Sequence, residues 1–349
     1  MQTPAPRRRG LVAAALAGAA CVAAPVLLRA QERPELPRLT LAAGPLSTCY
    51  YLPLAIAEQL GYFRAEGLDV AIGEHASGGS ALQAVLRGAA QVGAGAFEHA
   101  LRLHGRGQTF QAFVLQTRAP QIAVGVSTRT LARYHDPAIL RGRSIGVSSA
   151  GASTQLVARL LLARAGVAAG DVRFVEVGTG MQALQALRDG RLDAISNTEP
   201  LMTMLEQQGD VRIVADTRSL KGSHELFGGP MPAACLHAPA AFVAAYPATC
   251  QALASAIVRA LKWLQTAGPG DIVRSLPENY LLGGRALYLA SFQKVRETFS
   301  PDGLIPAEGG ATALRAMARA EPGFDPGRID PDKLYTNLFA RRAKERFKL

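Results

Sequence analysis

The sequence predicts an α/β protein of two lobes, each a mostly parallel β-sheet with helices on both faces and a ligand cleft between the lobes. Short apolar strands alternate with helices that end at glycine, an order typical of parallel sheets. The same order recurs about 100 residues later. The chain has 349 residues, 49% of them hydrophobic, which is enough for two domains with their own cores.

The first unit of this pattern runs from residue 39 to about residue 105. Strands are expected at 39–43, 68–72 and 91–95, and helices at 52–60, 80–87 and 98–103. Gly61, Gly88 and Gly105 follow the three helices, where the left-handed backbone that ends many helices favours glycine.

The second unit repeats the first. Its strands are expected at 144–147, 172–177 and 192–196, and its helices at 153–165 and 181–188. Two sequence echoes support duplication: 81–85 resembles 183–187, and Ser47-Thr48 resembles Ser153-Thr154. Acidic residues close the units at Glu98 and Glu199.

Duplication of this kind divides the chain into two lobes. We expect lobe one at 36–122 and 233–349 and lobe two at 123–232, with hinge-bearing crossings at 117–126 and 230–237.

The N-terminus has the features of an export signal. Arg7 to Arg9 precede the uncharged apolar run 11–28, so residues 1–30 are predicted to be a signal peptide that is removed. The Sec and twin-arginine routes both remain open, and Cys21 is a candidate for lipidation. Either route predicts a periplasmic protein.

The charge of the chain and its distribution indicate which partners are expected. The formal net charge is +11, four of the arginines lie in the predicted signal, and the remaining charge is spread along the chain. The basic end between Arg341 and Lys348 is interpreted as a solvated helix end, so no nucleic-acid partner is expected.

Three cysteines remain after signal removal. In an oxidising compartment Cys235 and Cys250 could form a disulfide, and three buried free thiols including Cys49 are the alternative.

The loops that follow the strands should share one crevice, because open α/β sheets bind ligands at the carboxyl ends of their strands. These loops, at 44–49, 76–79, 96–98, 148–154, 178–180 and 197–200, are rich in small polar residues. The predicted ligand-binding residues are Ser47, Thr48, Tyr50, Gly78, Gly79, Phe97, Glu98, Ser148, Ser149, Ser153, Thr154, Thr179, Asn197 and Glu199.

Two chemistries are expected in these loops. The loop 148–154 precedes a helix, whose free N–H groups favour an anion by about 0.3–2 kcal/mol, although Ser153 and Thr154 could simply cap that helix. Tyr50 and Phe97 could stack on a flat ligand or pack in the core.

Glu98 and Glu199 are the acidic candidates. Each could accept a hydrogen bond from an amino or amide group of the ligand, and each could instead brace a helix start. If both face the crevice, a zwitterion or nitrogen heterocycle is favoured over nitrate or sulfate, which two carboxylates would repel.

No catalytic, metal or cofactor site is predicted. The segment GVSSAG at 146–151 lacks the spacing of a G-x-S-x-G nucleophile, and the histidines are too scattered for a metal site.

Four segments resemble the nitrate, sulfonate, taurine and bicarbonate family of ABC-importer binding proteins, which includes thiamine-pyrimidine binders. They are LPLAIAEQLGYFRAEGLDVAI (52–72), SGGSALQAVLRGAAQVGAGAFEHA (77–100), the stretch 140–200, and YPATCQALASAIVRALKWL (246–264). Gln91 stands where the family often has Asp, as Asp193 does in the second unit, so different bracing of that loop is expected.

The resemblance implies a periplasmic binding protein of type II that closes about a hinge. Such a protein captures a small anionic or zwitterionic ligand, sulfonate- or nitrogen-containing, for an ABC permease with its ATPase, and is expected to be a monomer. The alternatives are an extracytoplasmic ligand sensor and, further away, an enzyme of thiamine-pyrimidine type, whose clustered cysteine motif is missing here.

Overall fold

The computed structural model describes residues 1–2 and 33–349 of the chain. Most of the predicted signal peptide, including its arginines and Cys21, falls on residues 3–32 and lies outside the described residues. Within the described part, no helix is both long enough and apolar enough to cross a membrane.

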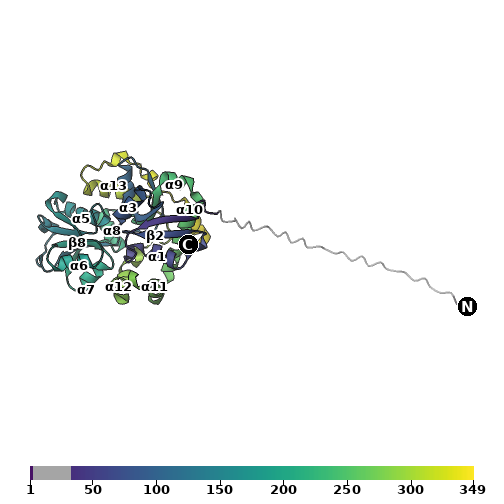
Figure 1. Cartoon of the computed structure of the whole chain (residues 1–349), viewed down its shortest axis with the longest axis horizontal. Coiled ribbons are helices and arrows are strands. Elements are labelled where there is room, and N and C mark those ends of the chain that lie inside the picture. The colour runs from purple at the N-terminus through teal and green to yellow at the C-terminus, as the bar shows by residue number, and fades with distance from the viewer. Residues whose placement is uncertain (3–32) are drawn as a thin grey trace. The chain divides into compact units, whose positions relative to one another are not determined.

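Residues 33–349 contain two five-stranded sheets (Figure 1). The first has the order β2-β1-β3-β10-β4, in which β1 pairs in parallel with β2 and β3, and β10 is antiparallel to β3 and β4. Its strands are β1 (Arg38–Ala43), β2 (Asp69–Glu74), β3 (Val92–Ala96), β4 (Phe110–Leu115) and β10 (Ala234–Pro239).

The second sheet repeats this arrangement. Its order is β7-β6-β8-β5-β9, with β6 parallel to β7 and β8, and β5 antiparallel to β8 and β9. Its strands are β5 (Ile122–Ser127), β6 (Ser144–Val147), β7 (Arg173–Glu176), β8 (Ala194–Thr198) and β9 (Val211–Asp216). In each sheet, four strands share one direction and the strand that arrives from the other half is reversed.

Helices surround both sheets, which confirms the predicted α/β class. They are α1 (Leu52–Gln59), α2 (Tyr62–Ala65), α3 (Gly78–Leu86), α4 (Glu98–His104), α5 (Ser153–Arg164), α6 (Met181–Arg188), α7 (Leu201–Gln207), α8 (Leu220–Phe227), α9 (Ala240–Ala245), α10 (Pro247–Thr266), α11 (Pro269–Ser275), α12 (Arg285–Val295), α13 (Gly309–Ala320) and α14 (Leu338–Phe347).

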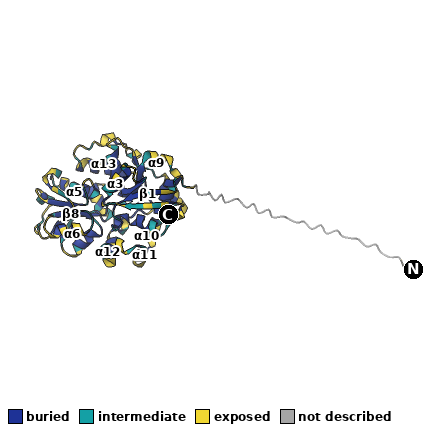
Figure 2. Cartoon of the chain, viewed as in Figure 1, coloured by how far each residue is buried: buried dark blue, intermediate teal, exposed yellow. Residues whose placement is uncertain are grey.

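Each sheet buries both faces because successive side chains point to opposite sides of a strand. In β1, Leu41 packs in the cluster with α1 and α10, whereas the next residue, Ala42, packs in the cluster with α3 and α4. In the second sheet, Ile195 packs with α6 and α7, and Ala194 packs on the face of α5. The inner strands of each sheet, such as β3 and β6, are therefore buried, whereas the edge strands β2 and β7 and the outer helices carry exposed residues (Figure 2).

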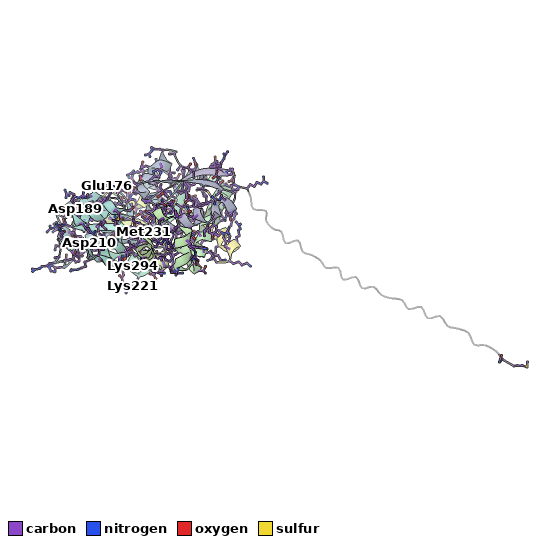
Figure 3. All side chains as sticks on the ribbon, turned by 60° about the horizontal axis from the view of Figure 1, so that its bottom comes forward. Glu176, Asp189, Asp210, Lys221, Met231 and Lys294 are labelled. Atoms are coloured by element: carbon purple, nitrogen blue, oxygen red, sulfur yellow. The ribbon has the colours of Figure 1, made fainter. Side chains whose placement is uncertain are left out.

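The chain passes between the sheets twice, from β4 to β5 and from α8 to β10. The C-terminal helices return to the first sheet, and α13 packs against α5 through apolar residues that include Leu160 and Met317. Glu176, Asp189 and Asp210 lie at the end of the molecule built on the second sheet (Figure 3).

The two halves brace the starts of corresponding strands in the same way. Gln91 accepts a hydrogen bond from the Thr40 N–H at 2.8 Å, and Asp193 accepts one from the Ser144 N–H at 3.0 Å. The expected difference in bracing was wrong, because the amide oxygen of glutamine makes the contact that a carboxylate makes in the other half.

All three described cysteines are buried free thiols, so the disulfide alternative is not formed. Cys235 lies within β10 with its thiol 3.5 Å from the Gly95 carbonyl, while Cys250 lies in α10 on the opposite face of the sheet. The sheet itself separates the two sulfur atoms.

Candidate functional site

A cavity of about 50 Å³ lies between the loops of the two sheets. It is lined by Pro45, Thr48, Tyr50, Tyr51, Ser77, Gly78, Gly79, Ala96, His99, Ile122, Ser148, Ala152, Ser153, Thr154, Thr179 and Thr198. Most of these residues follow β1, β2 and β3 in the first sheet and β6 and β7 in the second, while Ala96 and Thr198 end β3 and β8 and Ile122 begins β5. Such a volume is several times the roughly 10–15 Å³ that one water requires, but small beside drug-sized sites of about 300–1,000 Å³, so this arrangement suits a compact ligand.

The structure brings eight of the fourteen predicted site residues to this cavity. They are Thr48, Tyr50, Gly78, Gly79, Ser148, Ser153, Thr154 and Thr179. The other six, Ser47, Phe97, Glu98, Ser149, Asn197 and Glu199, are not among its lining residues.

Two of the residues outside the lining support the site from behind. Asn197 donates from Nδ2 to the Gly178 carbonyl at 2.8 Å and accepts from the Thr198 N–H at 2.9 Å, which ties together the loops after β7 and β8. Phe97 is fully buried and meets Tyr335 edge to face, with ring centroids 6.2 Å apart. Phe97 is therefore a core residue at the base of its loop rather than a stacking surface.

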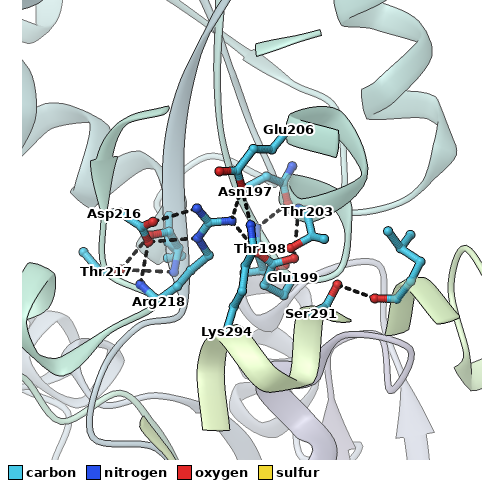
Figure 4. Close-up of polar contacts among 12 residues, drawn as sticks. Asn197, Thr198, Glu199, Thr203, Glu206, Asp216, Thr217, Arg218, Ser291 and Lys294 are labelled. Atoms are coloured by element: carbon cyan, nitrogen blue, oxygen red, sulfur yellow. Dashed lines mark hydrogen bonds and ion pairs between the residues drawn. The ribbon is translucent and has the colours of Figure 1, made fainter. Parts of the chain in front are cut away.

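Glu199 lies in a buried ion-pair network (Figure 4). Its Oε1 accepts from Arg218 at 2.7 Å, and its Oε2 accepts from the Thr203 N–H at 3.0 Å. Arg218 also donates to Asp216 and to Glu206. Both carboxylate oxygens of Glu199 thus have partners in the protein. This placement matches the alternative expectation that Glu199 braces a helix start, here that of α7, and differs from the predicted contact with a ligand.

Glu98 has a different environment. Its side chain is 2% exposed, Ser153 donates a hydrogen bond to its carboxyl group, and its Oε1 has no partner among the described residues. Burial raises the pKa of Glu98. Because Ser153 lines the cavity from the opposite sheet, Glu98 stands directly behind the cavity wall.

Several cavity-lining side chains keep an unsatisfied polar atom. Tyr50 Oη, His99 Nδ1 and Thr198 Oγ1 are buried and have no hydrogen-bond partner in the described part of the chain. Buried polar groups nearly always have a hydrogen-bond partner, so three unpaired groups around one cavity indicate a binding place for a polar ligand.

His99 is a site residue that the sequence did not single out. It follows Glu98 directly, and its ring centroid lies 6.3 Å from that of His237. Burial, together with Arg102 and His237, holds the pKa of His99 well below its usual value, and burial lowers the pKa of His237 to about 4. Both imidazoles are therefore neutral near pH 7, so His99 offers hydrogen bonding without charge.

Two helix starts point at the cavity. At α3, Ser77 accepts from the Ser80 N–H at 3.2 Å and donates its own N–H to the Ser80 hydroxyl at 3.0 Å, which fixes Gly78 and Gly79 at the first helical positions. A side chain at Gly78 would place its Cβ 3.0 Å from Tyr51 Oη, so glycine keeps this wall open.

The start of α5 has no side-chain cap, because the residue before the helix is Ala152. Thr154 instead braces the loop, since its Oγ1 accepts from the Ser148 N–H at 3.0 Å. The first N–H groups of a helix have no acceptor within the helix, so Ser153 and Thr154 present two donors here.

The lining contains no lysine or arginine. Nor do the described residues hold any group of three or more His, Cys, Asp or Glu side chains placed to bind a metal. The chemistry of the cavity is thus hydroxyl, amide and imidazole hydrogen bonding beside one buried carboxyl.

Comparisons with known proteins show which family and which fold this chain shares. Residues 32–273 match the sequence profile of the NMT1-like family. No protein with a curated description matches the sequence significantly. A protein of solved structure from Bordetella bronchiseptica RB50 is 52% identical, with a TM-score of 0.89 over 91% of this chain and 100% of that one.

Two more distant structures share the fold. The periplasmic nitrate-binding protein NrtA from Synechocystis PCC 6803 is 14% identical, with a TM-score of 0.70 over 90% of each chain. The alkanesulfonate-binding protein SsuA from Xanthomonas axonopodis pv. citri, bound to MOPS, is 15% identical, with a TM-score of 0.64 over 86% of this chain and 99% of that one. The chain therefore belongs to the NMT1-like family and has the fold of the periplasmic substrate-binding proteins of ABC import systems.

Proposed function

We propose that this protein is an exported solute-binding protein that captures a small anionic or zwitterionic ligand and delivers it to the permease and ATPase of an ABC importer. The observation that carries the proposal is the cavity itself, where unpaired buried polar atoms of both sheets converge. Binding proteins for nitrate and alkanesulfonates with the same fold support this class of function.

We further propose that the lobes are residues 36–122 with 233–349, and residues 123–232, and that they close about the two crossings. Contacts between the halves support a closed arrangement here. The Cys49 N–H donates to the Glu199 carbonyl at 3.1 Å, and the Leu220 N–H donates to Glu297 at 2.8 Å. A ligand that contacts both lobes would shift the population toward the closed form by its differential affinity.

The ligand should contact the residues that line the cavity. The backbone N–H groups of Ser153 and Thr154 would donate hydrogen bonds to its acidic group. No fixed cation is required, because a helix start stabilises an anion by about 0.3–2 kcal/mol. Micromolar capture needs about 8 kcal/mol, which a few desolvated hydrogen bonds and the apolar walls can supply.

A thermal-shift screen of the mature protein against small sulfonates, carboxylates and nitrogen heterocycles tests the function. A ligand present at about 100 times its Kd should stabilise the fold by about 2.7 kcal/mol. If no compound raises Tm and calorimetry detects no binding, the proposed function fails.

The substitution Ser153→Asp tests the site. The new carboxylate at the start of α5 should repel an acidic ligand group and lower affinity at least tenfold in calorimetry. Tm of the free protein should also fall, because Glu98 loses the hydrogen bond from Ser153 and gains a carboxylate neighbour. Ser219→Asp at the start of α8 is the matched control, since Ser219 is away from the cavity. Equal affinity of the Ser153→Asp variant and the wild type would remove this loop from the site.

A further inference from the structure

We propose that Glu98 is a specificity-determining residue, which makes the cavity select a zwitterionic or neutral ligand with an N–H donor over a simple anion. The inference rests on the proposed binding function and names the class of ligand.

The first step is the charge around the cavity. No lining residue is a lysine or arginine, and the two nearby histidines, His99 and His237, are buried and neutral near pH 7. A net anion would therefore meet helix N–H groups but no compensating cation. It would also approach a buried carboxyl group, whose ionised form repels it.

The second step is the incomplete hydrogen bonding of Glu98. Ser153 supplies one donor from across the cavity, whereas Oε1 has none among the described residues. The ionisable groups that face this carboxyl are Tyr50, Tyr51, Arg102, Cys235 and Glu321. Of these only Arg102 is a cation, and it is engaged by Glu321 and by the Gly151 carbonyl.

The third step is the position of the unpaired atoms. Tyr50 Oη lines the cavity on the side of Glu98, and it too lacks a partner. A ligand nitrogen placed between them would satisfy groups that the protein leaves open, and its charge or N–H dipole would stabilise the carboxylate. The acidic end of the same ligand would then lie at the starts of α3 and α5.

Calorimetry with three isosteric pairs tests this selection. In each pair a nitrogen donor replaces a methyl group: taurine and propane-1-sulfonate, β-alanine and butyrate, and 4-aminopyrimidine and 4-methylpyrimidine. We expect the donor to bind at least tenfold more tightly than its methyl partner in at least one pair. Glu98→Gln should reduce that preference at least tenfold, whereas Glu98→Asp should retain most of it.

Glu345→Gln, an exposed residue of α14, is the matched control and should leave the preference unchanged. The inference is overturned if the methyl compound binds as tightly as the donor in every pair. It is also overturned if a correctly folded Glu98→Gln variant keeps the preference. If the thermal-shift screen finds only a net anion without an N–H donor, the inference fails and the binding function stands. If neither experiment finds any ligand, the two fail together.

Discussion

Glu98 and Glu199 follow corresponding strands, β3 in the first sheet and β8 in the second, and both are buried. The protein surrounds them differently. Glu199 is held by Arg218 and by the Thr203 N–H, whereas Glu98 has the Ser153 hydroxyl and one oxygen without a partner. Sites where local rules are left unsatisfied tend to be functional ones. The comparison therefore teaches that two corresponding positions have different roles: Glu199 joins structural elements, whereas Glu98 keeps an oxygen without a partner among the described residues, the feature on which the proposed ligand contact rests.

The network around Glu199 also reaches the C-terminal part of the first half. Glu206 of α7 accepts from Arg218 and pairs with Lys294 of α12 (Figure 4). Hence Arg218, whose side chain is 4% exposed, connects a buried carboxylate to the contact between α7 and α12. Within residues 33–349, Glu98 forms no ion pair of this kind, since the neighbouring Arg102 is paired with Glu321.

The largest expected effect follows removal of the cation beside Glu199. Arg218→Met should lower the free energy of unfolding by about 3–5 kcal/mol, because a buried carboxylate loses its counter-charge. Urea denaturation with an unchanged m-value measures this loss. Lys221→Met is the control, since Lys221 forms an exposed pair with Glu225 and should change stability by no more than about 0.5 kcal/mol. A loss below 1 kcal/mol for Arg218→Met would break the comparison.

The next effect concerns the neutral histidines near Glu98. The pKa of His237 is about 4 in the fold, against an ordinary value of 6.5, because the side chain is buried. As pH falls, His237 is protonated in the unfolded chain before it is protonated in the fold. The free energy of unfolding therefore falls by about 3 kcal/mol between pH 6.5 and pH 4. Unfolding curves between pH 4 and 8 should show this fall, and His237→Gln should flatten it. An equally steep fall in the variant would assign the pH dependence to other groups.

The smallest effect compares the two glutamates directly. Glu199→Gln should cost about 2 kcal/mol at pH 7, because it weakens a charge-assisted bond to Arg218. Glu98→Gln should stabilise the free protein by up to about 1 kcal/mol, because burial raises the pKa of Glu98 and penalises its ionised form.

The sign of the Glu98 effect also depends on pH. A raised folded-state pKa gives stability that is present below the ordinary value of 4.5 and is lost as pH rises through the folded value. The gain from Glu98→Gln should therefore grow with pH. A gain that stays constant between pH 4 and 8 would show that Glu98 does not pay the expected cost of burial when it ionises.

Much of the architecture could be predicted from local patterns. Strand β6 and helix α6 have the predicted bounds, and the other predicted strands and helices differ by one or two residues at their ends. Apolar runs that alternate with helices ending at glycine can be recognised from short stretches of sequence. Their recurrence about 100 residues later indicated two similar units. The loops around Ser148 and Gly78 could be assigned to a common site because the carboxyl ends of parallel strands share one edge.

The partners of individual side chains were not predictable in this way. Arg218 and Glu199 are 19 positions apart, and no sequence period connects them. Cys235 and Cys250 are close in sequence but lie on opposite faces of a sheet. His99 was considered only as a metal ligand, because a single histidine has no pattern that points to a ligand cavity, and only the tertiary structure places it in the lining.

By itself the sequence determined the α/β class, the duplication and the loops that face the crevice, because these follow from hydrophobic period and chain order. Only the tertiary structure decided which acidic residue is paired with a cation and which keeps an oxygen without a partner in the described part of the chain. The physical reason is that the state of a buried carboxyl depends on the few charges and donors within hydrogen-bonding distance. Those neighbours come from distant parts of the chain, as Arg218 does for Glu199 and Ser153 does for Glu98.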